Sequence, residues 1–162
     1  MIENRVCVIG SGATAIHVLK NFIGFPKLLD LTVLESSTEV GKGMPYRVDM
    51  NADYMLCNAF SREIPRITRS LIEWLEEFPK YELDEWKLSS HELSPRAFYP
   101  RLLIGEFLSD EFSKLCELLK KQGHQITVKM SEHVVDLIGS ENGSTNVTTG
   151  RCWKGNPTTR CR

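Results

Sequence analysis

Residues 6–15 read Val-Cys-Val-Ile-Gly-Ser-Gly-Ala-Thr-Ala, and this stretch decides the fold. Its first four residues are apolar and predict a short buried strand. The glycines that follow break the strand, and residues 16–22 then look helical. A second apolar run covers residues 31–34 and ends on Glu35. The order strand, glycine turn, helix and strand predicts a βαβ unit with parallel strands.

The small residues of the turn suit the binding of a pyrophosphate. Gly10 permits a tight turn out of the strand, and Gly12 lets a pyrophosphate approach the backbone because glycine has no Cβ. Ala15 is small enough for the place where the helix meets the strand. The helix N-terminus adds unpaired N–H groups and the positive end of a dipole. The residues predicted to bind the phosphates of a dinucleotide are Gly10, Ser11, Gly12, Ala13, Thr14 and Ala15.

The acid at the end of the second strand favours a dinucleotide without a 2′-phosphate. Glu35, with Ser36 beside it, follows the turn by the spacing of about 20 residues that brings a carboxylate to a ribose. The carboxylate can accept hydrogen bonds from ribose hydroxyls and would repel the extra phosphate of NADP. An S-adenosylmethionine-dependent methyltransferase is an alternative, because that class also combines a glycine turn with such an acid. A plain α/β domain with a solvated Glu35 is the alternative without a ligand.

Composition excludes several classes of function. The 162 residues are 41% hydrophobic and 25% charged, values typical of one globular domain. A net charge of −1 offers no basic surface for nucleic acid or for an anionic membrane. No apolar run reaches the ~20 residues that cross a bilayer, and no signal peptide precedes the first strand. We therefore expect a cytoplasmic protein that binds a small-molecule dinucleotide, and no nucleic acid and no membrane.

The cysteines and histidines do not form a recognisable metal or redox motif. Cys7 and Cys116 are expected to be small buried residues, and Cys57 lies in a loop-like segment. The sequence contains no CxxC pair, and its histidines lack metal-ligand spacing. We predict no metal site, and the catalytic side chains remain unknown. Trp74 and Trp86 are interpreted as anchors of the core and of the surface.

The rest of the chain predicts a mixture of loop, helix and strand. Helical spacing, prolines and short alternating runs mark the boundaries. The predicted elements are a loop over 36–58, a helix over 67–78 ended by Pro79, a surface connection over 80–92, a helix over 97–122 with Pro100 in its first turn, strands over 125–130 and 134–138, and a hairpin strand over 142–150.

The last residues differ in composition from the rest. Residues 151–162 contain two cysteines, three arginines and a tryptophan without an apolar period. We interpret them as an irregular tail that follows a domain over residues 1–150.

Several segments, taken in order, resemble the FAD/NAD(P)-binding flavoproteins, distant relatives of the flavin-dependent N-hydroxylases. The resemblance covers about residues 5–138, and the ordered series is more specific than any single motif. The segments that carry it are the turn at 10–15, Glu35 after 31–34, Gly41-Lys42-Gly43-Met44-Pro45-Tyr46, Leu56-Cys57-Asn58, the helix at 71–75, Pro95-Arg96-Ala97-Phe98-Tyr99, and His133-Val134-Val135-Asp136.

The resemblance implies a fold, a cofactor and an activity. The fold would be a Rossmann-like α/β domain with a parallel sheet and a helical insertion. FAD would be the cofactor and NAD(P)H a co-substrate, with Gly43, Met44 and Asn58 near the ribityl or flavin end and the Val134 backbone near the adenine. The chain would be the FAD-binding portion of a flavin-dependent oxidoreductase or monooxygenase-like protein.

Two further expectations follow from the resemblance. Proteins of that family continue beyond this length, so residues 1–150 would be the N-terminal part of a truncated FAD/NAD(P)-binding domain, and the sheet is expected to be incomplete. A non-catalytic dinucleotide-binding module is the alternative function.

Overall fold

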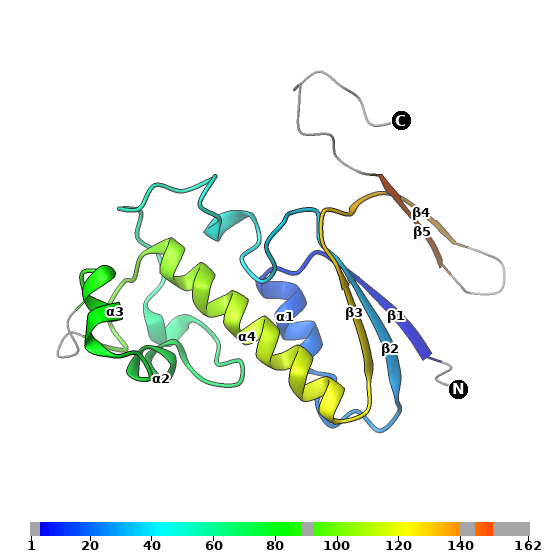
Figure 1. Ribbon diagram of the computed structural model, residues 1–162, viewed down its shortest axis with the longest axis horizontal. Coiled ribbons are helices and arrows are strands. Elements are labelled where there is room, and N and C mark those ends of the chain that lie inside the picture. The colour runs from blue at the N-terminus through cyan, green and yellow to red at the C-terminus, as the bar shows by residue number, and fades with distance from the viewer. Residues whose placement is uncertain (1–3, 89–92, 140–144, 151–162) are drawn as a thin grey trace, which may run out of the picture.

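A three-stranded parallel sheet forms one side of the domain (Figure 1). The structure is a computed structural model that describes residues 4–88, 93–139 and 145–150. The middle strand of the sheet has a strand on each side, and its residues Leu29, Leu31, Val33 and Leu34 are buried. The strands, in the order β1–β2–β3, are β1 (Asn4–Ile9), β2 (Leu29–Leu34) and β3 (Gln125–Lys129). Together with the helices, this sheet confirms the predicted Rossmann-like α/β fold.

Two helices, α1 (Ala13–Lys20) and α4 (Arg101–Lys121), pack beside the sheet and cover one of its faces (Figure 1). Side chains alternate across the strands, as the pleat requires. Val6 and Val8 of β1 pack against the core, whereas Cys7 between them is exposed. The prediction of a buried first strand with a buried Cys7 is therefore wrong, since among the described residues helices cover only one face of β1.

The sheet has three strands in the part of the chain that the structure describes. Within the described residues, β1 pairs with β2 alone, in parallel register from Asn4 opposite Leu29 to Ile9 opposite Leu34. The further strands β4 (His133–Gly139) and β5 (Thr145–Gly150) form a separate antiparallel hairpin that extends beyond the sheet (Figure 1). Strands were predicted in both places, and both are confirmed.

Helix α4 is the longest element, with 21 residues, and it begins later than predicted. Pro100 lies at the N-cap in an extended conformation instead of in the first turn. The residue before a proline avoids the helical region, so Tyr99 cannot extend the helix backwards. The apolar face of α4 is buried against α1 and against the segment between β2 and α4. Its buried residues include Leu103, Phe107, Phe112, Leu115 and Leu119.

The segment between β2 and α4 contains short helices only. These are η1 (Met44–Tyr46), η2 (Ser61–Glu63), α2 (Leu71–Glu76) and α3 (Lys80–Glu85). Helix α2 is shorter than the predicted helix over 67–78, because a capping box starts it at Ser70. The predicted surface connection over 80–92 includes α3, whose Leu83 is buried in the core. The predicted tail, residues 151–162, lies outside the described residues, so the domain boundary at residue 150 stays a prediction.

Candidate functional site

The glycine turn joins β1 to α1 and is bonded to the end of β2. Gly10 has a φ of +84°, a left-handed conformation that favours glycine. Its N–H donates to the carbonyl oxygen of Leu34 at 2.7 Å. Gly12 then occupies the N-cap of α1, and no side chain caps that end of the helix. The first N–H groups of α1 therefore lack a side-chain acceptor, an arrangement that suits phosphate oxygens.

Gly12 also lies against the loop that follows β2. A Cβ on Gly12 would lie 3.2 Å from the Cα of Gly43, and a Cβ on Gly43 would lie 3.3 Å from the Cα of Gly12. Gly43 itself has a φ of +59°. Two backbones thus approach each other with no side chain between them. A larger residue at Gly12 would therefore press on the backbone of Gly43 in the facing loop.

Ser11 links the turn, the end of β2 and the loop. Its hydroxyl donates to Oε2 of Glu35 at 2.7 Å, and its N–H donates to the same oxygen at 2.9 Å. The Ser11 hydroxyl oxygen also accepts a hydrogen bond from the N–H of Gly41 at 3.0 Å. Ser11 and Glu35 are both buried. These bonds hold three separate segments in one arrangement.

Both carboxylate oxygens of Glu35 have donors within the protein. Oε1 accepts from the Ser37 N–H at 2.8 Å and from the Ser36 hydroxyl at 3.3 Å. Burial is the largest influence on Glu35 and opposes its ionisation, but the hydrogen bonds from Ser11, Ser37 and Ser36 together outweigh it and lower the pKa of the carboxyl. A ribose hydroxyl would have to replace one serine hydroxyl on Glu35. The ribose contact therefore stays a prediction.

Lys42 is a buried cation beside the turn. Its Nζ donates to Oε1 of Glu39 and to Oε1 of Glu106, each at 2.8 Å, and 6% of its side chain is exposed. Burial alone would lower the pKa of Lys42, but its hydrogen bonds to Glu106 and Glu39 outweigh burial and raise it. The amine therefore keeps its positive charge at neutral pH, and two of its three hydrogens are donated to these carboxylates.

A cavity of about 270 Å³ opens between the turn and the loop, and we call it the glycine-turn cavity. Exposed backbone and the uncapped N-terminus of α1 meet there, so the residues present fit the pyrophosphate of a dinucleotide. The cavity is lined by Ile9, Gly10, Gly12, Ala13, Thr14, Ala15, Lys42, Gly43, Pro45 and Tyr46.

The structure brings some of the predicted cofactor residues together and leaves others apart. Six of them line the cavity, namely Gly10, Gly12, Ala13, Thr14, Ala15 and Gly43. Ser11, Glu35 and Ser36 lie next to these residues and are joined by the hydrogen bonds described above. Met44 and Asn58 are exposed, Val134 is half-buried on β4, and none of the three belongs to the lining. Their contacts with the flavin or the adenine stay predictions.

Sequence reasoning did not select Lys42, Pro45 and Tyr46 as site residues. The signal that could have found them is a pair of glycines at close-packed positions. A Cβ on Gly105 in the middle of α4 would lie 2.5 Å from the carbonyl oxygen of Tyr46. A Cβ on Gly41 would lie 2.4 Å from the Cα of Ser109. Glycine inside a helix is unfavourable without such a reason.

The described residues offer few groups for catalysis. No cluster of histidine, cysteine, aspartate and glutamate that could hold a metal ion occurs among them. Burial raises the pKa of Cys116 to about 11, so this thiol stays protonated at neutral pH. None of the helices in the described part of the chain is long and apolar enough to cross a membrane.

The fold and the glycine-turn cavity define a dinucleotide-binding domain of the Rossmann type. A family model described as FAD-NAD(P)-binding matches residues 7–155, which is most of the chain. The chain therefore belongs to the FAD-NAD(P)-binding family, and FAD is its cofactor. This assignment confirms the family resemblance and decides against the methyltransferase alternative.

The chain is similar to a protein of Escherichia coli (strain K12) named "Uncharacterized protein YdhS", with 32% identity over 133 residues. The match covers 82% of this chain, and the chain spans 25% of the length of that relative. Two solved structures are also similar, each at low identity. Thermovibrio ammonificans THI4 has a TM-score of 0.44 at 14% identity, covering 90% of this chain and 45% of the other. FqzB has a TM-score of 0.40 at 15% identity, covering 91% and 33%.

Proposed function

We propose that this chain is the FAD-binding portion of a flavin-dependent oxidoreductase or monooxygenase-like protein that uses NAD(P)H. The observation that carries the proposal is the close approach of Gly12 to Gly43 at the uncapped start of α1. Backbone without a Cβ and free helix N–H groups together match a pyrophosphate. A bound flavin would supply the redox chemistry, accepting hydride from NAD(P)H and passing electrons to oxygen or another acceptor.

The residues of this chain would bind and orient the cofactor. The N–H groups at the start of α1 would hold the pyrophosphate. Glu35 would accept from the adenosine ribose after one serine hydroxyl gives way, and its charge would disfavour a 2′-phosphate. Gly43, Met44 and Asn58 would approach the flavin end. Ser11 would act as a positioning residue, because it holds Glu35 and Gly41 in place.

The test is the visible absorption spectrum of the purified chain, desalted after incubation with FAD. We expect retained flavin bands at a stoichiometry near one. The variant Gly12→Val should retain at least about tenfold less flavin, because its side chain would press on Gly43 and displace the loop that lines the cavity. The matched control is Gly139→Ala on β4, where a Cβ meets nothing within 4 Å. Equal retention by the two variants would contradict the site.

The activity requires a second measurement. Addition of NADH or NADPH under exclusion of oxygen should bleach the flavin bands if the oxidoreductase proposal holds. Flavin that is retained and never bleached would favour the non-catalytic dinucleotide-binding module. Cell fractionation with an antibody to the chain would test the cytoplasmic location that the composition leads us to propose.

A further inference from the structure

A second cavity, of about 530 Å³, lies beside α2, α3 and α4, and none of its lining residues belongs to the glycine turn. We call it the aromatic cavity. One wall is aromatic and the other is one polar face of α4. The lining residues are Trp74, Phe78, Trp86, Glu106, Ser109, Asp110 and Ser113.

The polar wall follows from helical spacing. Positions 106, 109, 110 and 113 are separated by three or four residues, so their side chains lie on one face of α4. Two of these residues are carboxylates and two carry hydroxyls, and none is a cation. The side chains of Glu106 and Asp110 are 46% and 50% exposed. This face therefore presents acceptors and negative charge to the cavity.

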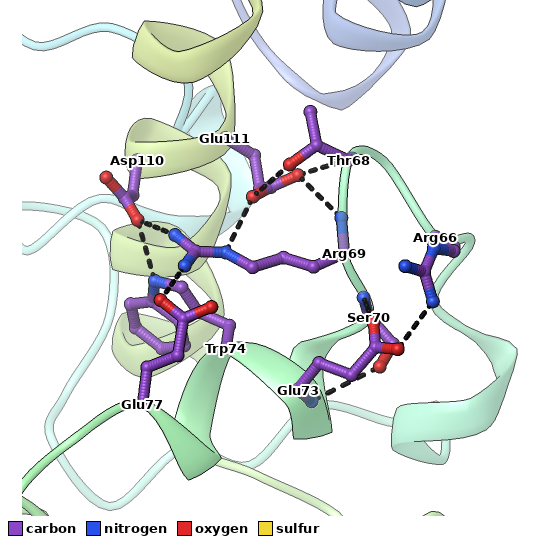
Figure 2. Close-up of polar contacts among 9 residues, drawn as sticks. All are labelled: Arg66, Thr68, Arg69, Ser70, Glu73, Trp74, Glu77, Asp110 and Glu111. Carbon is purple, nitrogen blue, oxygen red and sulfur yellow. Dashed lines mark hydrogen bonds and ion pairs between the residues drawn. The ribbon is translucent and has the colours of Figure 1, made fainter.

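The aromatic wall comes from the segments before and after α3. Trp74 packs edge-on against Phe78, with 4.6 Å between the ring centroids. Its indole N–H donates to Oδ2 of Asp110 at 2.8 Å, a contact that Figure 2 shows next to the Arg69 guanidinium. Trp86, the residue that follows α3, is half-buried and completes the wall. Aromatic faces attract cations through the ring quadrupole.

The nearby cations do not occupy both oxygens of the two carboxylates that line the cavity. Arg69 is shared among Glu77, Asp110 and Glu111, as Figure 2 shows. Lys42 is likewise shared between Glu39 and Glu106. In the described part of the chain, Oδ1 of Asp110 and Oε2 of Glu106 receive no hydrogen bond. Lys114 lies close enough to Glu77 to favour its charge, and it is not part of the lining.

We propose that the aromatic cavity binds a small organic cation with an alkylammonium group. The ammonium would donate to Asp110 and Glu106, with the serine hydroxyls as further acceptors. The methylene groups would lie against Trp74, Phe78 and Trp86. An anion would be repelled by both carboxylates, and a neutral apolar molecule would offer no donor to Oδ1 of Asp110 or Oε2 of Glu106. This inference goes beyond the proposed flavin function and does not depend on it.

The experiment is calorimetric titration of the whole chain with butylamine and with putrescine, followed by NMR of the tryptophan indole N–H groups. Butanol serves as the uncharged counterpart of butylamine. We expect saturable heat with the amines, shifts of the Trp74 and Trp86 indole signals, and no saturable heat with butanol. Equal binding of butanol, or no saturable binding of either amine, would overturn the proposal.

Variants locate the site. Asp110→Asn and Glu106→Gln should each weaken amine binding about tenfold, the effect of one charge-assisted hydrogen bond. Glu117→Gln, an exposed residue of α4 outside the cavity, is the matched control and should leave binding unchanged. Trp86→Leu touches no ion pair and should weaken binding about fivefold. Equal affinity of all four variants would overturn the site.

A lysine-containing peptide separates the two sources of an alkylammonium group. Tighter binding of the peptide than of butylamine would overturn the assignment to a free amine and would indicate a polypeptide partner.

Discussion

The two cavities are built in opposite ways. The glycine-turn cavity consists mainly of backbone, with Gly12 and Gly43 in near contact and Lys42 as its one cation. The aromatic cavity consists of side chains from α4 and from the segments around α3. The pair Lys42 and Glu106 lies between them, because Lys42 lines the first and Glu106 lines the second. The glycine-turn cavity requires residues without a Cβ, because a side chain there would cover the backbone. The aromatic cavity requires particular side chains, which supply its rings and carboxylates.

The largest expected effect falls on the side-chain network that supports the aromatic cavity. Glu111 is fully buried and accepts from the Thr68 N–H and hydroxyl, and from the Arg69 backbone N–H and Nε (Figure 2). Glu111→Ala should lower the free energy of unfolding by about 3–5 kcal/mol, because it leaves Arg69 without its buried partner. Urea denaturation measures this loss. The free energy of unfolding of the control Glu117→Ala should stay within about 0.5 kcal/mol of the parent. A comparable loss in both variants would show that the network around Glu111 does not stabilise this region.

The next effect falls on the backbone-built region. Gly41 has a φ of +83°, and a Cβ there would lie 2.4 Å from the Cα of Ser109. Gly41→Ala should destabilise the fold by about 2–3 kcal/mol, since both the strain and the clash involve backbone that cannot move aside. Thermal unfolding checks this value, and Gly139→Ala is the control. If Gly41→Ala is as stable as the control, the loop does not pack on α4 as described.

The third effect depends on pH. Because the folded pKa of Glu35 is lowered, its contribution to stability is fully present above its unfolded pKa of about 4.3. That contribution is lost as the pH falls through the lower folded value. The parent should therefore lose more stability than Glu35→Gln between about pH 5 and pH 3. At neutral pH, Glu35→Gln should cost about 1–2 kcal/mol through its hydrogen bonds. Parallel pH profiles would show that Ser11 and Glu35 do not interact as described.

The smallest effect concerns the start of α2, where the aromatic wall begins. The Ser70 hydroxyl accepts from the Glu73 N–H at 3.2 Å, and the Glu73 carboxylate accepts from the Ser70 N–H at 2.7 Å. Ser70→Ala should cost about 1 kcal/mol, the value of one helix cap. Circular dichroism during denaturation measures it. Ser113→Ala on α4 is the control. If it lowers the free energy of unfolding as much as Ser70→Ala does, the loss does not come from the helix cap.

The sequence predicted those parts of the candidate site whose residues are close together along the chain. The turn, the strands on either side of α1 and the acid at Glu35 follow one another within a short stretch, so their spacing alone predicts a dinucleotide site. Lys42 was not selected, because its role depends on Glu106, which is far away along the chain. The exposure of Cys7 could not be predicted either, since an apolar strand does not show which of its faces has a cover.

By itself, the sequence determined the class of fold, the place of the glycine turn and the family. Those features depend on local constraints, such as a glycine where φ is positive and a small residue where two backbones meet. Only the tertiary structure decided which carboxylates share Arg69 and Lys42, and that Trp74 and Trp86 face the polar side of α4 across one cavity. The physical reason is that these contacts join separate elements, and only the packing of α2, α3 and α4 brings their side chains within reach.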